Sequence, residues 1–111
     1  MAGGVSLRID LANGKQFGPG KARLLELIDE HGSISAAGRA MDMSYRRAWL
    51  LIEEMNSAFP EKLVIAKPGG SGGGGAAITD LGRTVLAAYR RIEAHAAASP
   101  DLALFYAPGP D

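Results

Sequence analysis

A small, mainly helical α+β domain is predicted for this chain of 111 residues. Three observations support it: an alternating apolar segment at residues 5–11, closely spaced segments of helical period within residues 21–59, and a glycine-rich loop at residues 68–75 between two short apolar runs. A period of two is typical of a half-buried strand, and apolar spacings of three and four are typical of helices. A pair of helices joined by a tight turn, then a two-stranded hairpin, then a further helix make up the winged helix-turn-helix arrangement.

The composition indicates one soluble domain, residues 1–98, followed by a tail, residues 99–111. The chain has no cysteine, which excludes disulfides and thiolate metal sites. It also lacks an apolar run of 18 residues, and Arg8 and Asp10 interrupt the N-terminal region where a signal peptide would lie. We therefore expect a cytoplasmic protein without a membrane segment.

The formal net charge is zero, with 12 basic and 12 acidic residues. Dedicated nucleic-acid-binding proteins are often basic overall, so this balance argues against strong nonspecific binding. The distribution of charge is uneven, however. Residues 33–50 contain three arginines and one aspartate, a local charge of 3 − 1 = +2. A basic face on a neutral protein is therefore predicted.

The N-terminal strand is followed by Asn13-Gly14, which favours a two-residue hairpin turn, and by a short return strand at residues 15–17. The period then changes to that of a helix over residues 21–31. Gly32 is predicted to end this helix in the left-handed conformation.

A second helix is predicted at residues 36–41, with Ser35 as its N-cap. It consists largely of small residues, so another helix can approach it closely. Asp42 lies at the following turn, where a left-handed backbone is easier for glycine than for aspartate.

Ser44 is predicted to cap the third helix, residues 45–59, which Pro60 ends. Trp49 falls among the apolar positions of this helix, and we expect it to pack in the core rather than to act as a stacking platform for nucleic acid. Strands are predicted at residues 63–67 and 76–78.

Thr79 is predicted to cap the last helix, residues 80–97. The tail contains an apolar run at residues 102–106. Packing on the domain, packing on a second subunit and disorder remain open for this run.

The first turn of the third helix carries the main functional signal. Ser44, Tyr45, Arg46 and Arg47 occupy it, and the N-terminal residues of a recognition helix are those that meet base edges. Arginine reads guanine through a bidentate pair. Two ordinary surface arginines are the alternative. Ser33 and Ser35, which precede the turn, complete the predicted DNA-binding set on this side.

The glycine loop allows three interpretations. It matches the dinucleotide-binding pattern, but a strand rather than a helix follows it. A flexible linker is disfavoured because about 36 residues remain, too few for a second core. The loop is best interpreted as a wing tip, in which Gly70, Ser71 and Gly72 approach phosphates or the minor groove and Lys67 supplies charge.

An enzyme is not predicted. His31 and His95 are 64 residues apart in sequence, and each lies near a predicted helix end. Glu53 and Glu54 are adjacent on a helix and therefore do not face each other. No resident metal or cofactor is predicted either. Binding of an oxyanion such as molybdate by Ser71 and the loop amides is a further alternative.

The chain resembles the DNA-binding domain of the ModE family of molybdate-responsive transcriptional regulators, which is similar to the LysR-type winged helix. The shared features are Gly32-Ser33-Ile34-Ser35 with Ala36-Ala37, Ser44-Tyr45-Arg46-Arg47-Ala48-Trp49 with Ile52 and Met55-Asn56, Gly69-Gly70 with Gly72-Gly73-Gly74-Gly75-Ala76, and Thr79 with Gly82.

The resemblance implies a homodimer that regulates transcription at a palindromic double-stranded DNA operator. It places Ser44, Tyr45, Arg46 and Arg47 in the major groove, and Lys67 with residues 69–75 in the wing. Full-length members carry C-terminal molybdate-binding domains, for which this sequence has no room, so we expect a stand-alone regulator. The alternative function is a winged-helix protein-interaction module without DNA binding, which the zero net charge and the apolar tail favour.

Overall fold

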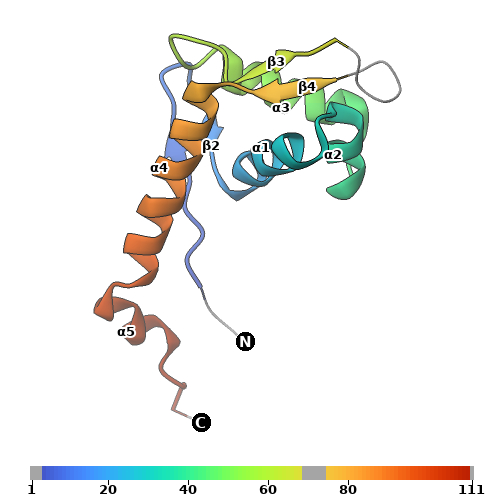
Figure 1. Cartoon of the computed structure of the whole chain (residues 1–111). Helices are drawn as coiled ribbons and strands as arrows, with labels where there is room; N and C mark the ends of the chain where they lie inside the picture. The colour runs from blue at the N-terminus through green and yellow to red at the C-terminus, as the bar shows by residue number, and fades with distance from the viewer. Residues whose placement is uncertain (1–3, 69–74, 111) are drawn as a thin grey trace.

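The computed structural model describes residues 4–68 and 75–110 (Figure 1). Its helices and strands follow the predicted order. The α-helices are α1 (Pro19–His31), α2 (Ile34–Ala40), α3 (Tyr45–Asn56), α4 (Asp80–Ala97) and α5 (Ala103–Tyr106). The strands are β1 (Ile9–Asp10), β2 (Gln16–Phe17), β3 (Val64–Ala66) and β4 (Ala76–Ile78).

The N-terminal hairpin is shorter than the alternating pattern predicts. Its ladder pairs Ile9 with Phe17 and Asp10 with Gln16, so most of residues 5–11 is extended but unpaired. The Leu11 amide donates to the Lys15 carbonyl at 2.8 Å, which leaves a three-residue loop, residues 12–14, instead of a two-residue turn. Gly14 has a φ of 81° and supplies the left-handed residue that such a loop requires.

Helices α1, α2 and α3 pack together around the core. α1 contributes more buried apolar residues than any other element. Its end is the predicted one: Gly32 has a φ of 67°, and its amide donates to the Ile28 carbonyl. The largest fully buried side chains are Tyr89, Phe17, Leu24, Leu25, Ile28, Ile52, Met55 and Leu63.

β3 and β4 form the antiparallel hairpin of the wing, with Val64 opposite Ile78 and Ala66 opposite Ala76. The base of the wing is attached to the junction between α1 and α2, because the Ala76 amide donates to the Gly32 carbonyl at 3.0 Å. The predicted α+β winged-helix fold is therefore confirmed.

α3 ends at Asn56, three residues before the predicted end, with Ser57 as its C-cap. The Asn56 side chain explains the early stop. Its Oδ1 accepts from the amides of Leu63 and Val64, and its Nδ2 donates to the Val64 carbonyl. Asn56, the last residue of α3, thus bonds the helix to the start of the wing.

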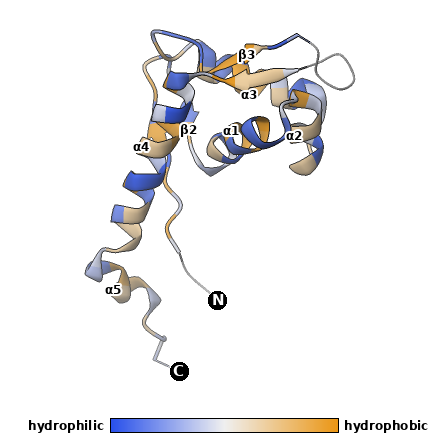
Figure 2. Cartoon of the chain, viewed as in Figure 1, coloured by the Kyte–Doolittle hydropathy of each residue, from blue (hydrophilic) through white to orange (hydrophobic). Residues whose placement is uncertain are grey.

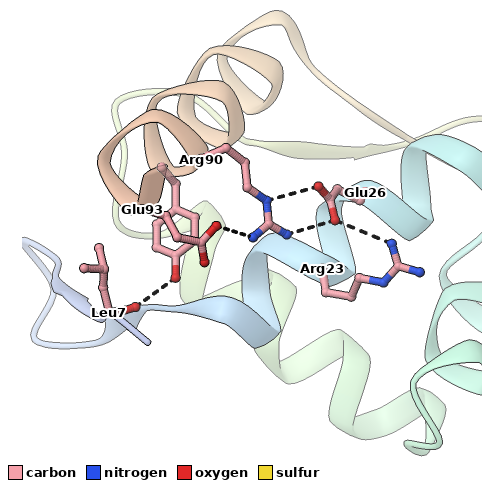
Figure 3. Close-up of polar contacts among 6 residues, drawn as sticks. Leu7, Arg23, Glu26, Arg90 and Glu93 are labelled. Atoms are coloured by element: carbon pink, nitrogen blue, oxygen red, sulfur yellow. Dashed lines mark hydrogen bonds and ion pairs between the residues drawn. The ribbon is translucent and has the colours of Figure 1, made fainter. Parts of the chain in front are cut away.

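α4 runs away from the three-helix core beside the N-terminal segment (Figure 1). Tyr89 joins the two segments because its hydroxyl donates to the Leu7 carbonyl at 2.8 Å (Figure 3). Its ring meets Phe17 edge to face, with centroids 5.1 Å apart. Burial raises the pKa of the Tyr89 hydroxyl.

A polar cluster also holds α4 on α1 (Figure 3). Arg90 binds both oxygens of Glu26, at 2.9 and 3.1 Å, and one oxygen of Glu93 at 2.8 Å. These bonds to Glu26 and Glu93 raise the pKa of Arg90. Arg23 completes the cluster, 3.5 Å from Glu26.

The apolar tail forms the short helix α5 and stays largely exposed. Leu104 and Phe105 are more than three-quarters exposed, while the Tyr106 hydroxyl donates to the Gly4 carbonyl and accepts from the Gly4 amide. The tail therefore touches the domain's N-terminal segment through Tyr106. Within the described ranges, no helix is long and apolar enough to span a bilayer.

Candidate nucleic-acid interface

The first turn of α3 projects into solvent. Ser44 caps it as predicted, since its Oγ accepts from the Arg47 amide at 3.0 Å. Tyr45, Arg46 and Arg47 are exposed. Two cations therefore stand at a helix N-terminus, where backbone amides also favour anions.

The turn before α3 has the conformation expected from the sequence. Asp42 has a φ of 56°, the single positive value among the described non-glycine residues. The Met43 amide donates to the Gly38 carbonyl, which closes the turn at 2.9 Å. A Cβ added to Gly38 would lie 3.4 Å from the Ala48 Cβ, so small residues do let α2 and α3 approach closely.

Ser33, not Ser35, caps α2. The Ser33 hydroxyl accepts from the Ala36 amide at 3.2 Å, and α2 begins at Ile34, two residues earlier than predicted. Ser33 is buried, and Ser35 is half-buried in the first turn. The buried Ser33 hydroxyl is thus occupied by the capping bond of α2 and is not placed to contact DNA.

The prediction that Trp49 packs in the core is wrong: its side chain is 42% exposed. The buried positions of α3 are Ala48, Leu51, Ile52 and Met55. At about 100° per residue, Trp49 lies about 110° from the centre of that stripe. Leu51 takes part in the core instead.

Trp49 faces a hollow of about 360 Å³ between α3 and the wing. Tyr45, Ile65 and Lys67 also line this hollow. β3 is hydrophobic along its length (Figure 2), yet Ile65 is 45% exposed. An apolar patch therefore lies between α3 and the wing.

The described residues of the wing are those at its base, up to Pro68 and from Gly75. Lys67 is exposed, and its amide donates to the Gly75 carbonyl at 2.9 Å. The predicted contacts Gly70, Ser71 and Gly72 lie outside the described residues. Lys67 and Trp49 line the same hollow, so the base of the wing and α3 contribute to one surface.

The outward face of α3 borders a second, larger hollow of about 780 Å³. Ser44, Arg46 and Arg47 line its N-terminal part, and Trp49, Leu50 and Glu53 line the rest. The interface is thus basic where α3 begins and more apolar along its second turn.

Glu53 and Glu54 lie in different environments, as expected for adjacent residues of a helix, and Glu53 is exposed. Glu54 instead pairs with Lys21 at 2.8 Å, and both side chains are largely buried. The hydrogen bond from Lys21 lowers the pKa of Glu54, and the charges of Lys21, Lys15 and Arg47 add to the effect. This pairing joins α1 to α3 and has no signature in the local sequence.

The exposed groups of this surface are suited to binding a partner. Within residues 4–68 and 75–110, no group of three or more His, Cys, Asp or Glu side chains is placed to hold a metal ion. What the surface does present is cations, backbone amides and flat apolar side chains. These are the groups that contact phosphates and base edges.

No protein-family model matches the chain. Among curated relatives, it is 40% identical over 87 residues to the molybdenum transport protein ModE of Azotobacter vinelandii, which covers 78% of this chain and 32% of the relative. It is 43% identical over 81 residues to the molybdenum-pterin-binding protein MopB of Rhodobacter capsulatus, 73% of this chain and 30% of the relative. It is 39% identical over 71 residues to the DNA-binding transcriptional dual regulator ModE of Escherichia coli K12, 64% of this chain and 27% of the relative.

The chain spans about a third or less of the length of these curated relatives. Several of the relatives are named as transcriptional regulators, and their names describe no enzyme. The chain is therefore a homologue of the ModE transcriptional regulators, matched to their N-terminal portion.

Proposed function

We propose that this chain is a sequence-specific DNA-binding transcriptional regulator whose helix α3 enters the major groove. The observation that carries the proposal is the exposed pair Arg46 and Arg47 on the first turn of a helix capped by Ser44. α2 and the turn after it complete the helix-turn-helix motif, in which α3 is the second helix. The names of the homologous regulators support the same function.

Each part of the interface has a distinct role. Arg46 points along the outward face of α3 and reads base edges, with Ser44 and Tyr45 beside it. Lys67 and the wing loop contact the backbone or the minor groove. A good bidentate arginine–guanine pair contributes about 1–3 kcal/mol of discrimination, so Arg46 and Arg47 account for much of the sequence preference.

Binding studies of arginine variants test this function. The Arg46→Ala and Arg47→Ala changes should each weaken binding by about 1–3 kcal/mol and relax base preference. The probe is a duplex selected from a random library with the unchanged chain. Lys62→Ala removes an equal charge from beyond the far end of α3 and serves as the control. Wild-type affinity in the Arg46/Arg47 double variant would refute the assignment.

A homodimer is part of the proposal. A neutral domain makes too few phosphate contacts to bind tightly alone, and two copies double them. α4 offers the surface: Ile92 is 47% exposed beside a hollow of about 400 Å³ lined also by Ala88, Arg91 and His95. A second candidate surface, the N-terminal segment, is partly engaged with α4 through Tyr89. Ile92→Glu should convert a dimer into a monomer in analytical ultracentrifugation.

A protein-interaction module is the second function that the structure supports. Trp49, Leu50 and Ile65 are all more than two-fifths exposed on the proposed interface. Such apolar exposure is also typical of protein contacts. A salt titration separates the two functions, because the logarithm of DNA affinity falls steeply with the logarithm of salt concentration. Binding to duplexes that does not respond to salt would favour the interaction module.

A further inference from the structure

A basic groove lies on the side of α3 opposite the wing. We call it the hairpin-side groove. It has a volume of about 490 Å³ and lies between the β1–β2 hairpin, the start of α1 and α3. Its charged lining residues are Arg8, Lys15, Lys21, Arg47 and Glu54.

Helical geometry places this groove opposite the wing. At about 100° per residue, Arg47, Leu51 and Glu54 point about 160° away from the wing-facing Tyr45, Trp49 and Ile52. Arg47 lines both the hairpin-side groove and the hollow over the outward face of α3. The outward face therefore continues into the groove without a break.

The groove carries an excess of positive charge. Four cations and one carboxylate line it, a balance of 4 − 1 = +3. Lys21 and Glu54 neutralise each other at 2.8 Å. Arg8, Lys15 and Arg47 are exposed and form no ion pair with any residue of the described ranges. Lys15 and Arg47 nevertheless both contribute to the lowered pKa of Glu54, which indicates that their charges converge there.

The start of α1 adds to this positive character. α1 begins after Gly18, which has no side chain to cap the first amides, and its first turn contains no acidic residue. Gly20 in that turn is exposed and lines the groove. Uncapped amides and the positive end of the helix dipole reinforce the three exposed cations, which are the primary feature.

We propose that the hairpin-side groove binds phosphodiester oxygens of the DNA strand that borders the major groove on the side away from the wing. The inference rests on the proposed function of α3. A helix with its side chains is about 10–12 Å wide and the major groove is about 12 Å wide, so an inserted helix has a phosphate strand on each flank. The wing meets one strand, and the hairpin-side groove meets the other.

Arg8 and Lys15 are the residues that test the proposal. Lys21 is unsuitable because its buried pair with Glu54 supports the fold. Arg8 also has a packing role, since a Cβ at Gly18 would lie 2.9 Å from the Arg8 Cγ. Glutamine retains that Cγ and removes the charge. The test variant is therefore Arg8→Gln/Lys15→Gln, and Lys62→Gln is the control that removes a charge elsewhere.

The experiment measures affinity against salt concentration for two duplexes, one selected from a random library with the unchanged chain and one of mixed sequence. Each lost phosphate contact should flatten the slope of log K against log salt by about 0.9, or about 1.8 per bound chain for the double variant. If the two proteins bind equally at 1 M salt, this difference in slope makes the double variant bind about 60-fold more weakly per chain at 0.1 M salt. The ratio of the two affinities should stay constant, because phosphates carry no sequence information.

The outcomes separate the two proposals. A double variant with the slope of the unchanged chain would overturn the groove assignment and leave the function of α3 intact. A changed ratio between the duplexes would also overturn it, because the groove would then read bases. If the unchanged chain is folded but selects no duplex from the library and does not bind the mixed-sequence duplex, the proposed function and this inference are both wrong.

Discussion

Gly82 fixes the position of α4 against the wing, and its replacement by alanine should destabilise the protein. Gly82 is the third residue of α4, and its amide donates to the capping hydroxyl of Thr79 at 3.0 Å. A Cβ at Gly82 would lie 2.5 Å from the Leu63 carbonyl oxygen, whereas ordinary contact begins near 3.4 Å. The carbonyl would have to move by about 0.9 Å, yet it also accepts the Thr79 amide at 2.9 Å.

The sign of the effect follows from two opposed contributions. Alanine is favoured over glycine in a helix interior by about 1 kcal/mol. Overpacking a tight site costs about 1–3 kcal/mol, and here the obstacle is backbone, which cannot change its rotamer. A contact as short as 2.5 Å belongs at the upper end of that range. We expect Gly82→Ala to lower the free energy of unfolding by about 1–2 kcal/mol.

Gly20→Ala is the matched control for this experiment. Gly20 is also in the first turn of a helix, but a Cβ there would meet nothing within 4 Å. It should be neutral or stabilising by up to about 1 kcal/mol. Urea unfolding followed by circular dichroism, at one fixed chain concentration, measures both variants. Equal stability of Gly82→Ala and Gly20→Ala would refute the reasoning.

Three further variants test single contacts. Asp42→Gly should stabilise by about 0.5 kcal/mol, or raise Tm by about 2–4 °C, because glycine adopts a positive φ without strain; an unchanged or lower Tm contradicts this. Glu54→Gln should destabilise at pH 7, and the difference from the unchanged protein in urea unfolding should shrink below about pH 4.3. The lowered pKa of Glu54 means that its contribution is present above the ordinary carboxyl value and is lost as pH falls. Tyr89→Phe should lower the free energy of unfolding at pH 7 by about 1 kcal/mol in urea unfolding, because the hydrogen bond to the Leu7 carbonyl is lost. The unchanged protein should also lose stability above about pH 10, because burial raises the pKa of Tyr89, and the phenylalanine variant should lack that loss.

Local signals in the sequence located the end of α1 and the starts of α3 and α4. Gly32, Ser44 and Thr79 were predicted as a C-cap and two N-caps, and each makes the corresponding hydrogen bond. These predictions are confirmed because capping depends on residues within four positions of one another. The bounds of β4 and α4 are also those predicted.

Contacts between distant residues limited the prediction elsewhere. Ser33 caps α2 in place of the predicted Ser35, and Ser33 also forms a β-bridge with Gly75 at the base of the wing. α3 stops at Asn56 because that side chain bonds to β3, eight residues further along. Nor could periodicity reveal that Arg90 bonds to Glu26 across 64 residues of chain.

Trp49 was predicted to be buried but is exposed, because hydropathy does not show which side of α3 the rest of the fold covers. A tryptophan three residues before Ile52 fits an apolar stripe as well as Leu51 does, so hydropathy alone cannot choose between the two sides. The choice falls to Leu51 because α1 and the hairpin cover that side of α3, whereas the other side opens on the wing hollow. α3 is therefore packed along the face that carries Ala48, Leu51, Ile52 and Met55. Around that face, its remaining positions line the apolar wing hollow, the basic outward hollow and the basic hairpin-side groove. A partner that meets all three of these surfaces must surround the helix on both flanks, which a duplex groove does and a flat protein surface does not.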